Sequence, residues 1–175
     1  MEIHEFEYFL SQYEKDIYSF CYHLTQNKYT ADDLYQDTAL RAFESIDKID
    51  STQNPKSFLI SIAVGKWKNE KRKLKRRNEI APFELYDEFS EKIKITSDSV
   101  ESCIIKKEIN TCIGTLLGQM DDKYRITLIL YYLEQYDTEV ISKICGIPKG
   151  TVKSRLYKGR ELIKKSLEKE GYQYG

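Results

Sequence analysis

Proline, glycine and histidine are scarce in this 175-residue chain, and each shortage argues against a class of protein. With only 3 Pro and 8 Gly, a turn-rich β fold is disfavoured and helices are favoured. The two histidines, His4 and His23, show no metal-ligand spacing, and the sequence has no nucleophile elbow and no phosphate-binding loop. We therefore expect a protein that is not an enzyme and needs no cofactor or metal.

Long apolar runs and paired cysteines are also missing. Without a signal peptide or an apolar run of ~20 residues, we expect neither secretion nor a membrane span. Because none of the 4 Cys belongs to a CxxC pair, reduced thiols in a cytoplasmic protein are expected.

Charge is balanced over the whole chain but not along it. The 28 Lys+Arg match the 28 Asp+Glu, yet residues 1–54 are mostly acidic. Two segments, residues 66–77 and 143–169, are strongly basic. Two basic segments far apart indicate two separate contacts with a polyanion, and the acidic start indicates a different partner, a protein.

Hydrophobic periodicity predicts helices throughout. Apolar residues recur at helical spacing over 5–27, from about 100 to 120, and again from about 123. Thr30 followed by Asp33 resembles a capping box that starts a helix running to about Ile46. Residues 58–64 are apolar on nearly all sides and lead directly into the basic segment 66–77. One helix with a buried first half and a solvated second half is predicted there, with Pro55 in its first turn.

The segment after this helix has no sustained period and contains Pro82, which is typical of a linker. We therefore predict an all-α protein of two small helical domains, residues 1–78 and 108–175, joined by a flexible linker over 79–107.

The C-terminal domain contains a helix-turn-helix pattern. A short helix capped by Asp137 or Thr138 should end at Gly146, where a left-handed residue is needed. Pro148 then suits the start of a second helix. On a helical wheel Val152, Leu156, Ile163 and Leu167 share an arc of about 60° and form the core side. Thr151, Ser154 and Lys158 lie on the opposite side, flanked by Lys153 and Arg155, and this arrangement suits a DNA major groove. The candidate DNA contacts of the helix-turn-helix are Lys149, Thr151, Lys153, Ser154, Arg155 and Lys158.

The run from Gly150 to Arg160, Gly-Thr-Val-Lys-Ser-Arg-Leu-Tyr-Lys-Gly-Arg, resembles the recognition helix of bacterial extracytoplasmic-function (ECF) sigma factors. The resemblance covers roughly residues 8–78 and 108–168. It departs from the family at Val140, where Glu is usual, and at Pro148, where a capping Ser is common.

Two N-terminal motifs carry the same resemblance. The run from Ala31 to Thr38 is similar to the family's helix that docks on the largest subunit of RNA polymerase. This similarity implies that core polymerase contacts Asp33, Leu34, Gln36 and Asp37, with Leu34 as an apolar anchor.

The run from Phe58 to Ala63 resembles the family's Trp-Leu-x-x-Ile-Ala, although Gly65 stands where Asn is usual. In that family the basic helix that follows binds the opened strand of the −10 element. This implies contacts from Lys66, Trp67, Asn69, Lys71, Arg72 and Arg76. Trp67 also lies one turn beyond Ala63 on the same face, so it is a candidate core residue as well.

The resemblance implies a sigma factor that binds core RNA polymerase and promoter DNA, serves a stress or envelope regulon and is held by an anti-sigma factor. Its helix-turn-helix would bind the −35 element. The alternative is a helix-turn-helix repressor or activator that acts without core polymerase. That alternative explains residues 137–165 but not the acidic cluster at 33–37 or the helix over 58–77.

Overall fold

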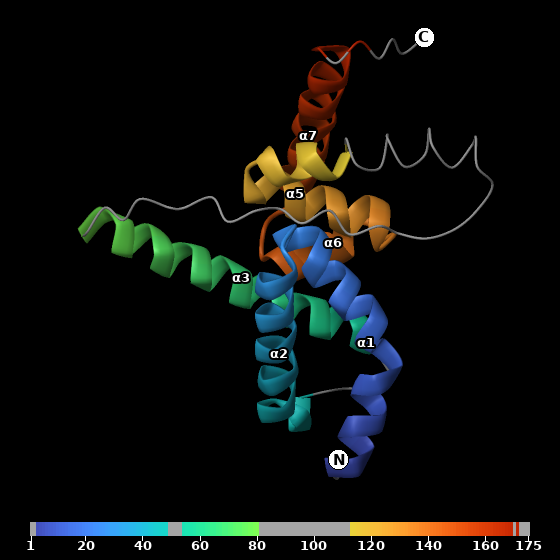
Figure 1. Cartoon of the computed structure of the whole chain (residues 1–175). Helices are drawn as coiled ribbons and strands as arrows, with labels where there is room; N and C mark the ends of the chain where they lie inside the picture. Colours follow the sequence, from blue (N-terminus) through green and yellow to red (C-terminus); the bar gives the residue numbers. More distant parts are fainter. Residues whose placement is uncertain (1–2, 49–53, 81–112, 170, 172–175) are drawn as a thin grey trace, which may run out of the picture. The chain divides into compact units, whose positions relative to one another are not determined.

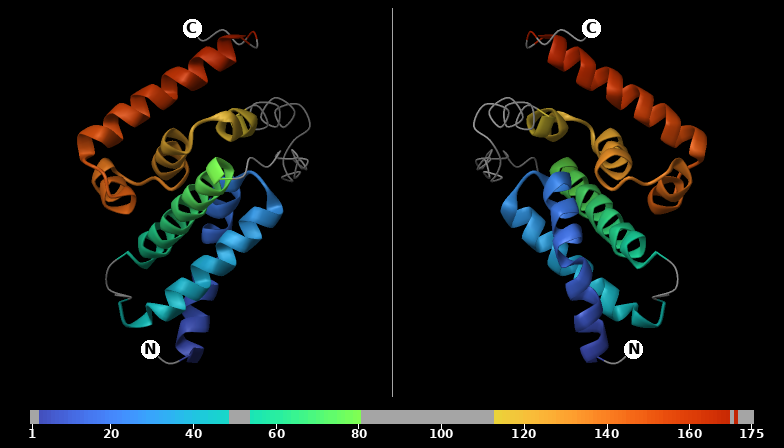
Figure 2. Two further views of the ribbon diagram at one scale, coloured as in Figure 1. Left: turned by 90° about the vertical axis from the view of Figure 1, so that its left-hand side faces the viewer. Right: turned by 90° about the vertical axis from the view of Figure 1, so that its right-hand side faces the viewer.

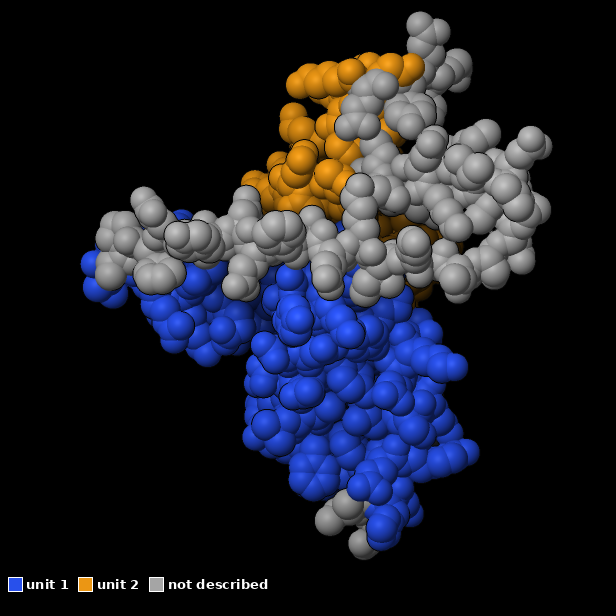
Figure 3. All heavy atoms as spheres, viewed as in Figure 1, with its two compact units in different colours: residues 1–90, 143–146 blue, residues 91–142, 147–175 orange. Residues whose placement is uncertain are grey.

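The structure, a computed structural model, describes residues 3–48, 54–80, 113–169 and 171. This part of the chain contains helices and no strand, which confirms the all-α prediction. The chain divides into two compact units, residues 1–90 with 143–146 and residues 91–142 with 147–175 (Figure 3). Of the predicted linker 79–107, only residues 79 and 80 are described, and they are helical. The predicted domain bounds therefore stay a prediction.

Among the described residues of the N-terminal part of the first unit, three helices pack against one another (Figures 1 and 2). They are α1 (Ile3–Thr25), α2 (Lys28–Glu44) and α3 (Pro55–Ile80), with a 3₁₀ turn η1 (Ile46–Lys48) after α2. Burial of apolar surface stabilises the bundle, since Ile17, Phe20 and Leu24 of α1 and Leu59 of α3 are all fully buried.

The turn between α1 and α2 differs from the prediction. Helix α1 ends at Thr25 because Gln26 adopts a left-handed conformation with φ 57°. Asn27, rather than Thr30, caps α2: its Oδ1 accepts the Thr30 backbone N–H at 3.0 Å. The Thr30 hydroxyl is also engaged by this cap, because it lies 3.2 Å from the same Asn27 oxygen.

Helix α3 confirms the predicted change from a buried to a solvated half. Pro55 is its first residue, and Leu59, Ile60, Ala63 and Val64 are fully buried. Beyond Lys68 the side chains are exposed, with Asn78 half-buried. Figure 1 shows this C-terminal half of α3 extending past α1 and α2.

The C-terminal helices follow the predicted order. Residues 113–119 are helical, and α5 (Asp122–Leu128) begins after its N-cap Asp121 and continues into a π-helical turn, η2 (Ile129–Leu133). After η2 come α6 (Thr138–Cys145) and α7 (Lys149–Lys169). Helix α7 packs on α5 at Gly159, where an added Cβ would lie 2.9 Å from Leu128 Cδ1.

Candidate nucleic-acid and protein interfaces

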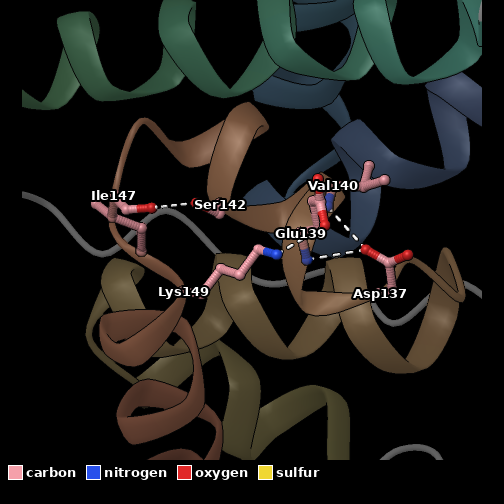
Figure 4. Close-up of polar contacts among 6 residues, drawn as sticks. All are labelled: Asp137, Glu139, Val140, Ser142, Ile147 and Lys149. Carbon is pink, nitrogen blue, oxygen red and sulfur yellow. Dashed lines mark hydrogen bonds and ion pairs between the residues drawn. The ribbon is translucent and has the colours of Figure 1, made fainter.

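The helix-turn-helix begins at Asp137, which caps α6. One Asp137 carboxylate oxygen accepts the backbone N–H groups of Glu139 and Val140, each at 2.8 Å (Figure 4). These are donors that the first turn of a helix cannot satisfy internally. Of the two predicted caps, Asp137 therefore takes the role, and Thr138 is the first helical residue.

The turn itself depends on Gly146. This residue has φ 65°, the left-handed conformation that the sequence predicted for it. The Ser142 hydroxyl donates to the Ile147 carbonyl at 2.5 Å, which links α6 to the far side of the turn (Figure 4). Pro148 lies one residue before α7, and its carbonyl accepts the Val152 N–H at 3.1 Å. The turn thus fixes where α7 starts.

The two predicted faces of α7 are distinct. Val152, Leu156 and Leu167 are buried, and Ile163 of the same stripe is half-buried. On the other side Ser154 and Lys158 are exposed and Thr151 is half-buried, flanked by the exposed Lys153 and the half-buried Arg155. Lys149, the first residue of the helix, is exposed next to this side. The helix therefore presents a surface of cations and hydroxyl groups to solvent.

A second cationic surface is the exposed half of α3. Asn69, Lys71, Arg72 and Arg76 are exposed, and Lys66 is half-buried. Arg72 is held in place, since its Nη2 donates to Asn69 Oδ1 at 3.0 Å. The one acid within residues 66–77, Glu70, accepts a hydrogen bond from Lys73 Nζ at 2.7 Å. That bond, with the charges of Lys73, Arg77 and Lys66, lowers the pKa of Glu70 below its usual value.

Trp67 differs from the other candidates on α3 because it is buried, at 7% exposure. Lys71 Nζ lies 4.5 Å from the centre of its ring, a cation–π arrangement. Of the two roles that the sequence left open, the structure places Trp67 among the core residues. Contact between this ring and a base requires Lys71 to move or the surroundings to open.

The acidic surface lies on α2. Asp33, Gln36 and Asp37 are exposed, whereas Leu34 is only 5% exposed. In this conformation the Leu34 side chain is therefore not exposed to a partner, and its role as an apolar anchor stays a prediction. Leu34 packs inside the first unit because it follows the same helical spacing as the buried residues Ala31, Thr38 and Ala42.

Sequence reasoning missed the apolar group that does lie on this surface. Leu40 is 57% exposed and shares an arc of about 100° with Asp33, Gln36 and Asp37. An exposed leucine among carboxylates suits a protein partner with cationic and apolar groups. The spacing of Leu40 from Asp33 and Asp37 could have shown this, because residues three, four and seven apart share a helix face. We call Asp33, Gln36, Asp37 and Leu40 the α2 surface.

Neither a metal cluster nor a membrane span is found within the described ranges. No group of three or more His, Cys, Asp or Glu side chains in them could hold a metal ion. Among their helices, none combines the length and the apolar character needed to span a bilayer.

Two family descriptions match the chain, and they match the regions that carry these surfaces. "Sigma-70 region 2" matches residues 9–77, and "Sigma-70, region 4" matches residues 110–163. Among curated proteins, the chain is 31% identical over 161 residues to the ECF RNA polymerase sigma factor SigW of Bacillus subtilis, covering 89% of this chain and 84% of SigW. To SigM of the same organism it is 29% identical, covering 87% and 88%.

Solved structures share the fold. The sigma factor RpoE of Bartonella quintana, crystallised with the anti-sigma factor NepR, superposes with a TM-score of 0.78 at 22% identity, covering 95% of this chain and 98% of RpoE. CnrH, solved in complex with the cytosolic domain of CnrY, gives a TM-score of 0.63 at 16% identity, covering 95% and 90%.

Proposed function

The chain belongs to the ECF family of RNA polymerase sigma factors, and from this we propose that it binds core RNA polymerase and directs it to promoters through its two cationic helices. The observation that carries this proposal is the pair of exposed basic surfaces, one on α3 and one on α7, accompanied by the acidic α2 surface. Cations suit phosphates, and carboxylates suit a basic protein.

Helix α7 enters the major groove at the −35 element. Its cations and backbone N–H groups hold phosphates, and its side chains contact base edges. The exposure of Lys149, Lys153, Ser154 and Lys158 and the closed turn at Gly146 support this role. The half-buried Thr151 and Arg155 flank the same face.

The exposed half of α3 holds the opened −10 strand. Its contacts are Lys66, Asn69, Lys71, Arg72 and Arg76. A cationic surface that follows a single strand's backbone is typical of such binding. Trp67 supports α3 from within the first unit.

The α2 surface binds core polymerase. Asp33 and Asp37 pair with basic side chains, Gln36 adds an amide, and Leu40 supplies the apolar contact at the centre. Leu40 thus has the role of apolar contact that the sequence assigned to Leu34.

Membership of the sigma factor family also bears on the chain's regulation and cellular location. The chain acts by binding and not by catalysis, works in the cytoplasm beside the polymerase and serves a stress or envelope regulon. Two structural neighbours were solved in protein complexes, RpoE with the anti-sigma factor NepR and CnrH with the cytosolic domain of CnrY. An anti-sigma factor that covers the basic or acidic surfaces is the corresponding partner here.

A binding assay separates this function from that of a repressor. Wild-type chain is mixed with promoter DNA, with and without purified core polymerase, and DNA binding is followed by gel shift. A sigma factor shifts promoter DNA selectively only when core is present, whereas a repressor shifts it selectively alone. Selective binding without core, combined with no capture of core by the tagged chain, would overturn the proposal.

A further inference from the structure

An ion pair joins the first turn of α6 to the first residue of α7. Lys149 Nζ lies 2.7 Å from Glu139 Oε2, and the two side chains are 55% and 54% exposed (Figure 4). The Glu139 backbone is fixed as well, because its N–H donates to Asp137 Oδ1 at 2.8 Å. The carboxylate of Glu139 therefore stands at the edge of the cationic surface of α7.

The charge pattern of α7 makes this carboxylate unusual. Residues 149–160 contain no acid, and the acids of α7 are Glu161 and Glu168 in its second half. A phosphate bound to Lys149 Nζ would lie beside the Glu139 carboxylate, and two anions in contact repel each other. To bind a phosphate, Lys149 must either break its ion pair with Glu139 or hold the two anions close together, which costs electrostatic free energy.

We infer that Glu139 is a positioning residue that restrains Lys149 and lowers the affinity of α7 for DNA of any sequence. Phosphate contacts carry no sequence information, so a penalty on one of them falls equally on promoter and unrelated duplexes. The ratio of the two affinities therefore stays the same, and Glu139 sets the overall affinity of α7 for duplex DNA. This role rests on the proposed binding of the −35 element by α7.

The test is Glu139→Gln, which keeps the side chain's length and hydrogen-bonding groups but removes its charge. Because exposed ion pairs contribute little energy, we expect binding that is tighter by roughly two- to fivefold. One more phosphate contact should also steepen the dependence of log affinity on log salt concentration by about 0.9. Both changes should be similar for specific and unspecific DNA.

The assay uses holoenzyme assembled from the full chain and purified core polymerase. One fluorescent duplex is selected from a random library with wild-type holoenzyme, and a second is a scramble of equal length and composition. Anisotropy titrations over a series of KCl concentrations give affinity and salt slope for each. Glu168→Gln is the matched control: it removes the same charge from an exposed site about 28 Å along α7.

A second variant assigns any effect to the pair itself. In a Lys149→Met background, Glu139→Gln should change affinity no more than Glu168→Gln does, because the restrained cation is gone. Equal effects of Glu139→Gln and Glu168→Gln in the wild-type background, or weaker binding by Glu139→Gln, would overturn the inference. The proposed function itself fails in a different way, if wild-type holoenzyme selects no duplex from the library.

Discussion

Gly159 of α7 and Leu128 of α5 lie in direct contact, so that a Cβ added to Gly159 would stand 2.9 Å from Leu128 Cδ1 and 3.1 Å from Cγ. Leu128 is itself only 3% exposed and has little room to move. The absence of a side chain at Gly159 is therefore what allows the two helices to approach each other.

Gly159→Ala should accordingly destabilise the second unit. Overpacking costs about 1–3 kcal/mol and exceeds the gain of about 1 kcal/mol from better helix propensity. Gly65→Ala is the matched control, because it lies inside α3 with nothing within 4 Å of the added Cβ. Thermal unfolding followed by circular dichroism should show a lower midpoint for Gly159→Ala and an unchanged or higher one for Gly65→Ala. Equal midpoints would contradict the account of this contact.

Truncation of Leu34 should affect stability, whereas truncation of Leu40 should affect polymerase binding. Leu34→Ala removes a buried side chain and should lower the free energy of unfolding by about 2–4 kcal/mol. Leu40→Ala removes an exposed one and should change it by less than about 0.5 kcal/mol while weakening core binding. Urea unfolding can be followed by the fluorescence of Trp67, the chain's one tryptophan, which lies in the same unit. If Leu40→Ala bound core polymerase with full affinity, Leu40 would not be part of the polymerase-binding surface.

Local sequence signals predicted several features of the fold. Gly146 ends α6 in a left-handed conformation, and Pro55 begins α3, because each residue is favoured at that position for a backbone reason. The change at residue 66 from apolar to basic side chains also predicted that the second half of α3 is solvated. These features depend on neighbouring residues alone, and this is why the sequence was sufficient.

Features that depend on packing or on unusual backbone conformations were not predicted. Gln26 is left-handed without being glycine, so no signal marked the end of α1 or pointed to the Asn27 cap. The resemblance placed Leu34 on a partner surface, but contacts with the other helices of the unit bury it. Trp67 had two possible roles because one residue type serves both core packing and base stacking.

Because of Cys21, the free energy of unfolding should depend on pH in the alkaline range. Its thiol is fully buried, and burial raises its pKa from 9.0 to about 12. Because the folded pKa is the higher one, the stabilising effect of the protonated thiol is complete below pH 9 and is lost as the pH rises toward 12.

The comparison is between wild type and Cys21→Ala under reducing conditions. From pH 8 to about pH 10.5, the stability advantage of wild type should shrink by about 2 kcal/mol, since each pKa unit corresponds to about 1.4 kcal/mol. Urea unfolding of both proteins at both pH values measures this change in the stability difference. A constant difference between the two proteins would show that Cys21 titrates alike in folded and unfolded chains.

Asp37 and Arg155 should divide the two binding functions between them. Asp37→Ala should weaken core binding about tenfold without altering promoter preference in saturated holoenzyme. Arg155→Ala should leave core affinity unchanged and weaken −35 binding roughly 5- to 100-fold. Core affinity is measured by titrating labelled chain, and −35 binding with duplexes altered at that element. Loss of both properties in both variants would contradict separate surfaces.

Run-off transcription with purified core polymerase tests the central claim most directly. Core alone should start at no defined site, whereas core with the wild-type chain should give discrete transcripts from templates of the promoter library. With Arg155→Ala at concentrations that saturate core, these transcripts should decline most on templates that depend on the −35 element. If wild-type chain bound core but never produced a defined start on any template, two cationic helices that direct polymerase to promoters would be the wrong account of this protein.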